Sequence, residues 1–264
     1  MLDWFAWAFR LIKVDYDQLR AIVAMKLLTD NRRQHISYRR KNQKDPGNAF
    51  ITTLLVYGFF GIFVALAFYS IPSFMLSMIL FFSYMMVMVA LTLITDFSSI
   101  LLDTSDNTII LPRPVDGRTL FVARVTHILL YLGQLALSLS IVPAVSVFFK
   151  YGAVLCLLFV IAIIFSILTA VFLTNGLYLL ILQFSSEEKL KNIINYFQIL
   201  TAIGIMSGYQ ILPRLLERLD METFVFEIKW WNFLLPPVWM AGALETIGFL
   251  VLDPKHLGLT ACAI

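Results

Sequence analysis

Charged residues are almost absent from five long segments of the chain, and this restricts the folds that it can adopt. These segments are residues 50–71, 74–95, 125–149, 154–182 and 193–212. Each is about as long as the ~20 residues that a helix needs to cross a bilayer. Because lipid offers the backbone no hydrogen-bond partners, such segments must be helical. The sequence predicts an all-α polytopic membrane helical bundle with about five transmembrane helices.

The composition supports a membrane environment. The chain is 60% hydrophobic and 14% charged, with a mean hydropathy of +0.84. A soluble domain carries about 25% charged residues. Lipid, rather than a large buried core, is expected to cover most of the apolar surface.

The basic residues are concentrated at the N-terminus and predict the orientation. Ten of the 20 Lys and Arg lie in residues 1–49. Since loops that stay in the cytoplasm carry the excess of Lys and Arg, we expect a cytoplasmic N-terminus. Residues 96–124 and 185–192 would then be cytoplasmic, with short outer turns at 71–74 and 150–151. We expect the basic segment to set this topology and to meet anionic lipid headgroups, not nucleic acid.

The chain divides into three predicted regions: 1–49 before the spans, 50–212 with the spans, and 213–264 after them. Within residues 1–30, Leu19, Ile22, Val23 and Leu27 recur at three- and four-residue spacing, which indicates amphipathic helices. These helices can lie at the headgroup level or pack on the cytoplasmic end of the bundle. Both interpretations remain open from the sequence.

Several residues predict details of the spans. Pro72-Ser73 and Lys150-Tyr151-Gly152 should form tight turns between neighbouring helices. Pro143 lies inside the third span and should kink that helix or end its regular part. Gly204 and Gly208 form a small-residue face on the fifth span. That face can receive another helix of this chain or of a second copy.

The region after the fifth span changes character. Trp230 and Trp231 are typical of an aromatic belt at the membrane interface. Pro236-Pro237 breaks the chain, and residues 238–252 are apolar but short. They can form an outer re-entrant or interfacial helix, or the first part of a sixth span.

The loop between the second and third spans carries the most specific pattern. Asp103, Ser105 or Asp106 can cap a short helix whose apolar residues are 109–111. Pro112 and Pro114 would end this helix, and Asp116 can cap the helix that leads into the third span. The result is a short helix across the mouth of a helical hairpin. It can dock another protein, or it can be a well-capped connector.

These residues carry a resemblance to a known family. The loop has an acidic residue (Asp103 or Asp106), the apolar run 109–111 with Leu111-Pro112, then Arg118 and Ala123-Arg124. In this order they resemble the coupling loop of permease subunits of bacterial type-2 ATP-binding cassette (ABC) exporters. Residues 26–33, the loop 185–189 and residues 236–241 are also similar to that group.

The resemblance implies the site residues and the partner. The loop helix would dock in a cleft of a separate cytoplasmic ATPase subunit, and ATP-driven closure would switch the spans between inward and outward states. The implied coupling residues are Asp103, Asp106, Leu111, Pro112, Arg113, Asp116, Arg118 and Arg124, with Glu187, Glu188 and Lys189 in the second cytoplasmic loop.

Location and assembly also follow from the resemblance. The expected location is the bacterial inner membrane. Members of the family are about twice as long as this chain, so the sequence is expected to be the N-terminal half, working with a second half or a second copy.

The chain itself is not expected to be an enzyme. It has no G-x-x-x-x-G-K-[ST] phosphate-binding loop, so ATP hydrolysis would belong to the partner. Glu187-Glu188 at the end of a span is similar to the paired glutamates of intramembrane proteases. However, His35 and His256 lie outside the spans, so we expect no cluster of histidines and carboxylates at one depth, no metal and no cofactor.

The other open alternatives are a secondary transporter and a membrane scaffold. Ion-coupled transporters usually place ionisable groups within the spans, and the five predicted spans have no Asp, Glu or Lys in their middle.

Overall fold

A computed structural model of the 264-residue chain describes residue 7 and residues 14–32, 49–102, 116–184, 187–218, 228–250 and 253–263. All regular structure in these ranges is helical. The helices are α2 (Tyr16–Arg32), α3 (Ala49–Ser70), α4 (Phe74–Leu102), α6 (Gly117–Tyr151), α7 (Ala153–Phe184), α8 (Glu187–Arg218), the 3-10 helix η2 (Trp230–Leu234), α9 (Pro236–Phe249) and α10 (Pro254–Ala263). The prediction of an all-α membrane bundle is confirmed.

Each of the five predicted spans, apart from Ile71 at the end of the first, lies within one helix: α3, α4, α6, α7 or α8. Among the described residues, three stretches are long and apolar enough to cross a membrane: Phe74–Ile94, Gly117–Tyr151 and Ala153–Leu177. The shortest has 21 residues and a length of about 31 Å at 1.5 Å per residue. This matches the ~30 Å hydrocarbon core of a bilayer. Shorter apolar stretches lie in α3 (Phe50–Leu66) and α8 (Gln198–Gly208). The protein is an integral membrane protein.

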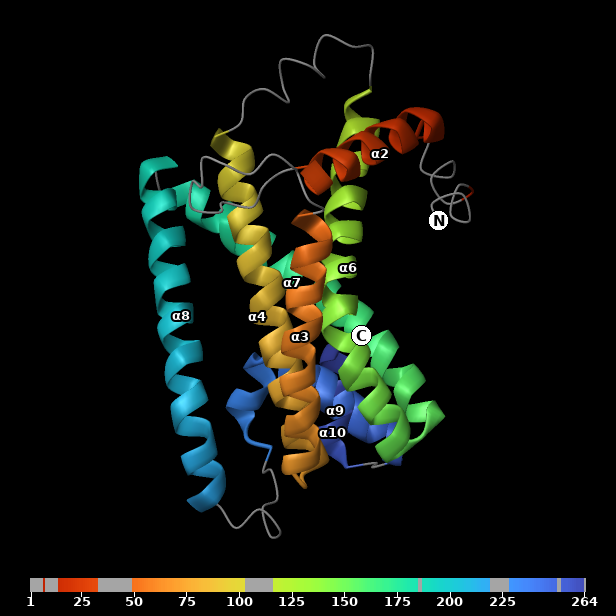
Figure 1. The fold of residues 1–264 in the computed structure, drawn as a ribbon, viewed down its shortest axis with the longest axis vertical. Coiled ribbons are helices and arrows are strands. Elements are labelled where there is room, and N and C mark those ends of the chain that lie inside the picture. Colours follow the sequence, from red (N-terminus) through yellow and green to blue (C-terminus); the bar gives the residue numbers. More distant parts are fainter. Residues whose placement is uncertain are drawn as a thin grey trace.

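Two tight turns place the long helices side by side. Ile71–Ser73 separates α3 from α4, and Ser73 Oγ accepts a hydrogen bond from the Leu76 N–H at 3.4 Å in the first turn of α4. Gly152 separates α6 from α7 with φ 93° and ψ 173°, a conformation that glycine adopts without steric cost. Both turns lie at the end of the bundle opposite α2 (Figure 1), as predicted from Pro72-Ser73 and Lys150-Tyr151-Gly152.

The core of the bundle is aromatic. Phe81 contacts Phe159 at 4.8 Å between ring centroids, and Phe68 lies 6.0 Å from Phe81. These three side chains come from α4, α7 and α3 and are fully buried. Tilted and edge-to-face rings of this kind add to the free energy of apolar burial. They fix the three helices against one another near the end opposite α2.

Pro143 does not interrupt its helix. α6 runs from Gly117 to Tyr151 with Pro143 buried inside it, so of the two predicted effects, a kink or an end of the regular helix, the second is wrong. Proline removes one backbone donor, which leaves the Leu139 carbonyl without its usual partner. A neighbouring helix can compensate for such a loss inside a membrane bundle.

The described part of residues 238–252 belongs to α9, which forms a hairpin with α10. α9 has 14 residues, about 21 Å in length, too short to cross the ~30 Å hydrocarbon core. Leu250, the residue after its last turn, adopts the left-handed conformation with φ 54° and ψ 38°, and α10 packs back against α9. Both helices lie at the end opposite α2 (Figure 1). α9 alone is therefore too short to cross the membrane, and the two interpretations of residues 238–252, an outer re-entrant or interfacial helix and the first part of a sixth span, stay predictions.

Candidate functional site

The described structure includes only part of the candidate coupling region. Asp103, Asp106, Leu111, Pro112 and Arg113 lie outside the described residues. Asp116 precedes α6, and Arg118 and Arg124 lie on its first two turns. The end of α4 and the start of α6, between which the undescribed loop runs, both lie at the α2 end of the bundle (Figure 1).

Asp116 occupies the N-cap position of α6, as predicted, but its side chain does not cap the helix. Its extended backbone (φ −62°, ψ 136°) leads into the helix, and its side chain makes no capping hydrogen bond. The backbone carbonyl of Asp116 accepts the first helical hydrogen bond, from the Leu120 N–H at 3.0 Å. The exposed carboxylate still interacts favourably with the positive end of the helix dipole. Arg118 is also exposed, so both charges are accessible to a partner.

α2 lies across the start of α6 and is held there by polar contacts. Asp15 caps α2, since its Oδ1 accepts hydrogen bonds from the N–H groups of Asp17 (3.1 Å) and Gln18 (3.3 Å). The Asp15 N–H in turn donates to Thr119 Oγ1 at 3.4 Å. Thr119 is buried in the first turn of α6. The start of α2 and the start of α6 are therefore joined directly.

Apolar packing reinforces this junction. Val14, Leu19, Val23 and Ala123 form a separate buried cluster, with Ile22 and Leu130 packed against it. Leu19, Val23 and Ala123 are fully buried. The four-residue spacing of Leu19 and Val23 places both on one face of α2, and the small Ala123 side chain allows α6 to approach that face. We call the set Val14, Asp15, Leu19, Val23, Thr119 and Ala123 the α2–α6 junction.

Ala123 and Arg124, the pair that carried part of the resemblance, have different environments in the structure. Ala123 is buried against α2, whereas Arg124 is half-buried on the next position of α6. Sequence reasoning found Ala123 only through the resemblance and did not find Thr119. Thr119 contacts Asp15 across 104 positions of the chain, and no local pattern indicates a pairing at that separation.

The second predicted cytoplasmic loop lies at the same end of the bundle. Glu187, Glu188 and Lys189 form the first turn of α8, and residues 185–186 between α7 and α8 are outside the described residues. α8 begins at the α2 end (Figure 1). The described residues of both predicted coupling segments, in the first turns of α6 and α8, therefore lie at one end of the bundle.

The small-residue face of α8 is open. A Cβ atom added at Gly204 or Gly208 would meet no atom within 4 Å in the described part of the chain. Whether another helix of this chain or of a second copy packs on this face stays a prediction. Another small residue, which was not singled out from the sequence, lies where α3 meets α6. A Cβ atom added at Gly58 of α3 would lie 3.5 Å from Ser138 Oγ of α6.

Polar side chains within the long helices mostly bond to nearby backbone or to each other. The hydroxyl groups of Tyr57 and Thr92 lie 2.9 Å apart between α3 and α4. Ser138 on α6 donates to the Leu54 carbonyl on α3 at 2.6 Å. Asn175 donates to the Val171 carbonyl of its own helix at 2.8 Å. These contacts satisfy polar groups inside the apolar layer.

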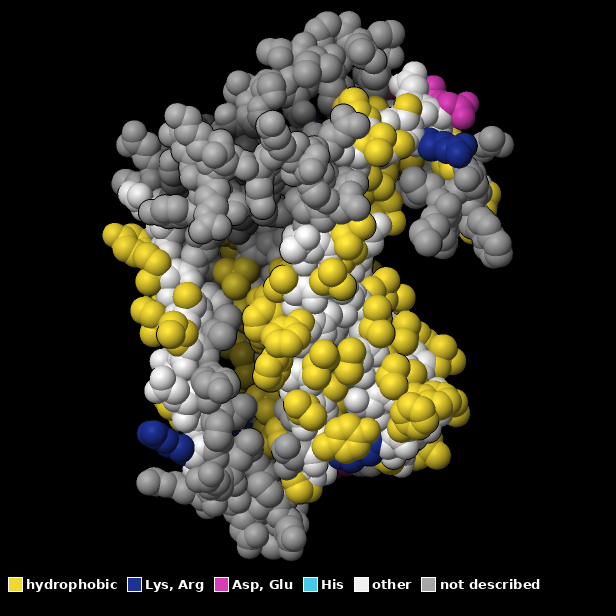
Figure 2. Space-filling view, viewed as in Figure 1, with side chains coloured by type: hydrophobic (Ala, Val, Ile, Leu, Met, Phe, Trp, Pro, Cys, Tyr) yellow, Lys and Arg dark blue, Asp and Glu magenta, His cyan; other side chains and the backbone are white. Residues whose placement is uncertain are grey.

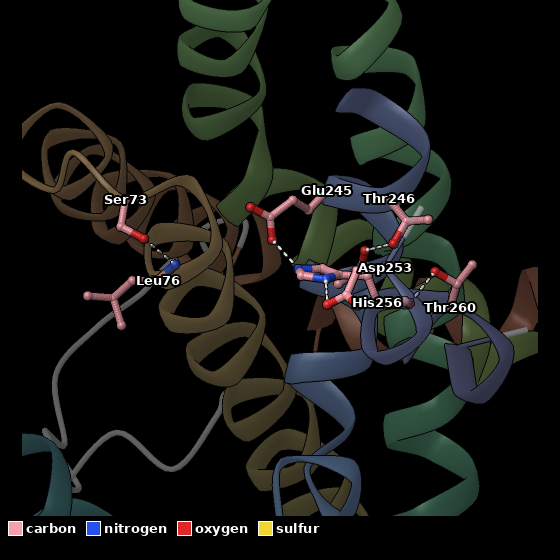
Figure 3. Close-up of polar contacts among 8 residues, drawn as sticks. Ser73, Leu76, Glu245, Thr246, Asp253, His256 and Thr260 are labelled. Carbon is pink, nitrogen blue, oxygen red and sulfur yellow. Dashed lines mark hydrogen bonds and ion pairs between the residues drawn. The ribbon is translucent and has the colours of Figure 1, made fainter. Parts of the chain in front are cut away.

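A second charged cluster lies at the opposite end of the molecule. His256 Nε2 lies 3.3 Å from Glu245 Oε2, and His256 Nδ1 lies 3.5 Å from Asp253 Oδ2 (Figure 3). The three side chains meet because α10 packs back against α9 after Leu250. No group of three or more His, Cys, Asp or Glu residues in the described ranges has an arrangement suited to a metal ion.

Comparisons with protein-family models, with curated proteins and with solved structures give no match for this chain.

Proposed function

We propose that the chain is the membrane-spanning permease subunit of a bacterial ABC exporter, or its N-terminal half, and that a separate cytoplasmic ATPase subunit drives it. The observation that carries this proposal is the α2–α6 junction. It ties a helix lying across one end of the bundle to the first turns of a long spanning helix, directly after the segment that resembles a coupling loop.

The junction suits a mechanical role. A load applied to the loop before Asp116 acts on the start of α6, and α6 is one continuous helix of 35 residues, about 52 Å long. Asp15, Thr119 and the buried cluster hold α2 to this helix. Movement of the loop would therefore displace α2 and α6 together and reach the opposite end of the bundle through α6.

Exposed charges at the same place supply contacts for a partner. Asp116 and Arg118 are exposed on one side of the junction, and Asp17 is exposed on α2. Charged groups at the rim of an interface mainly affect partner choice and association rate. In this proposal Arg118 and Asp116 contact the ATPase, together with the loop 103–115.

The proposed orientation places the α2 end in the cytoplasm of the bacterial inner membrane. Ten of the 20 Lys and Arg of the chain belong to residues 1–49, the region that includes α2. The bias of basic residues toward the cytoplasm supports this orientation.

A purification from native membranes tests the proposal. The tagged chain is extracted in mild detergent, and the co-purified proteins are scored by mass and by ATP hydrolysis. We expect a cytoplasmic ATPase with the unaltered chain and roughly 10-fold less of it with Arg118→Ala, the ratio for a loss of ~1.4 kcal/mol in binding.

Arg214→Ala is the matched control, because Arg214 is an exposed arginine on α8 near the opposite end. This variant should retain the ATPase. Equal recovery of the ATPase with both variants would show that Arg118 does not contribute to the interface. A preparation of the unaltered chain without any ATPase would refute the proposal and favour a secondary transporter or a scaffold.

A further inference from the structure

An open groove lies between α10 and α7, with α9 as its floor. Its walls include Leu158 and Phe165 of α7 and Thr260 of α10, and its floor includes Ala243 and Leu244 of α9. The volume of the groove is about 90 Å³. α9 packs against both α7 and α10, whereas α10 packs chiefly against α9. The groove is therefore the space that the hairpin leaves between α10 and the long helix α7.

The packing on both sides of this space is close. A Cβ added at Gly242 of α9 would lie 2.7 Å from Leu259 Cδ1 of α10. A Cβ added at Gly248 of α9 would overlap the Leu155 side chain of α7. Since α9 is held tightly to both neighbours, the groove is a gap of fixed shape and not a general looseness of the hairpin.

The lining of the groove is apolar. Thr260 is its single polar residue, and the Thr260 hydroxyl donates to the His256 carbonyl of its own helix at 2.9 Å. A water molecule bound in a protein needs two to four polar partners, whereas apolar cavities stay dry and take up apolar molecules. The groove therefore suits a hydrocarbon ligand.

The groove lies at the depth of lipid acyl chains. Its α7 residues belong to the candidate span Ala153–Leu177. Leu158 and Phe165 lie about 9 and 20 Å along α7 from Gly152, at 1.5 Å per residue. Half of the hydrocarbon core is ~15 Å thick. The groove thus runs through most of one leaflet, the one at the hairpin end opposite α2 (Figure 1).

The size of the groove selects among apolar ligands. A helix with its side chains is about 10–12 Å wide, and the groove has only about three times the ~30 Å³ that one water molecule occupies in the liquid. An extended hydrocarbon chain can enter such a space, but a helix of a second copy cannot. Ile161 and Ile247 at the groove are 42% and 49% exposed, so a chain can enter from the surrounding lipid.

We propose that this groove binds one acyl chain of a membrane phospholipid and that the chain fills the gap between α7 and α10. The lipid comes from the leaflet at the hairpin end. Its chain contacts α7, α9 and α10 at once and so joins α10 to the spanning bundle. This site is independent of any ATPase partner.

Lipid retention tests the proposal. The protein is incorporated into vesicles of phosphatidylethanolamine and phosphatidylglycerol, extracted and washed in mild detergent, and weighed intact by native mass spectrometry. We expect one phospholipid to stay on each unaltered chain. Ala243→Leu places a larger side chain in the groove and should retain about 10-fold less lipid, the ratio for losing the burial of roughly two methylene groups.

Ala202→Leu is the matched control, because Ala202 is exposed on α8, away from the groove. This variant should retain the lipid as the unaltered chain does. Equal retention by Ala243→Leu and Ala202→Leu, or an unaltered chain without lipid, would overturn the proposal. A dimer without lipid that Ala243→Leu dissociates would assign the groove to a second copy and would also overturn it.

A second measurement needs no substitution. The same vesicles contain a phosphatidylcholine with a diazirine midway along one acyl chain, and the washed protein is illuminated and digested. We expect the cross-links that survive the wash to lie on the groove residues of α7, α9 and α10. Surviving cross-links confined to other surfaces, such as the exposed Leu66 of α3, would contradict a chain bound in the groove.

Discussion

At the scale of single residues, the contact between Gly61 and Leu139 explains how a proline fits inside a spanning helix. Pro143 lies four residues after Leu139 and cannot donate to its carbonyl. Gly61 of α3 packs directly against that carbonyl, and a Cβ added to Gly61 would overlap the oxygen. The missing side chain lets α3 approach α6 where α6 lacks a hydrogen bond. α3 therefore covers the carbonyl that lacks its helical partner, and α6 continues through buried Pro143 without a break.

Substituting Gly61 should therefore be costly. We expect Gly61→Ala to lower the free energy of unfolding by about 1–3 kcal/mol, the usual range for overpacking. Gly133→Ala on α6 is the control, because an added Cβ there meets nothing within 4 Å. It should leave stability unchanged or raise it by up to ~1 kcal/mol through better helix propensity. Thermal unfolding in detergent measures both, and equal midpoints for the two variants would disprove the close contact.

At the scale of elements, α2 is attached to the bundle by one face. Leu19 and Val23 are fully buried against Ala123, whereas Leu28 of the same helix is 64% exposed. Figure 1 shows α2 lying across the end of α6 with its axis roughly perpendicular to the long helices. The attachment depends on a few apolar side chains and on Asp15, so a single truncation should loosen the whole element.

Leu19→Ala should release α2 more readily than Leu28→Ala. Removal of a fully buried leucine side chain costs about 2–5 kcal/mol, and this cost falls on the docking of α2. Brief trypsin digestion reports the release, since Arg20 and Lys26 lie within α2. Faster cleavage in Leu19→Ala, and unchanged cleavage in Leu28→Ala, is the expected result. Equal cleavage of both variants would show that α2 is not held by its Leu19 face.

The elements also show what could be predicted from the sequence. The five apolar segments and the spacing of Leu19 and Val23 predicted helices, because both signals are local. The sequence did not predict which helix α2 packs against, because Asp15 and Thr119 are 104 positions apart and no local pattern connects them. The α9–α10 hairpin was left open because its turn depends on Leu250 at φ 54°, a conformation that sequence patterns associate with glycine or asparagine.

The candidate site could be predicted only in part for a related reason. The order of Leu111-Pro112, Arg118 and Ala123-Arg124 indicated a loop leading into a helix, and α6 begins at Gly117. The role of Asp116 as a side-chain cap was not found, because capping depends on a rotamer that residue type does not determine. Of the eight residues of the first coupling segment, Asp116, Arg118 and Arg124 are described.

At the scale of the whole molecule, charge and apolar surface are separated along the bundle. Figure 2 shows Lys, Arg, Asp and Glu side chains of the described residues toward the two ends, with hydrophobic side chains between them. α2 lies at one end, and η2 with the exposed Trp230 lies at the other. Tryptophan near a span end favours the membrane interface. The arrangement fits a protein that crosses the bilayer and presents a different surface on each side.

The central claim is that the α2 end of this bundle faces a cytoplasmic ATPase, and cysteine accessibility tests it most directly. After replacement of Cys156 and Cys262 by serine, single cysteines are placed at Leu28 on α2 and at Leu234 on η2, which are 64% and 81% exposed. Intact cells are treated with a membrane-impermeant thiol reagent before and after permeabilisation. The account predicts that Leu234→Cys reacts in intact cells and Leu28→Cys only after permeabilisation. Reaction of Leu28→Cys in intact cells would place the α2 end outside, away from any cytoplasmic ATPase, and would contradict the account.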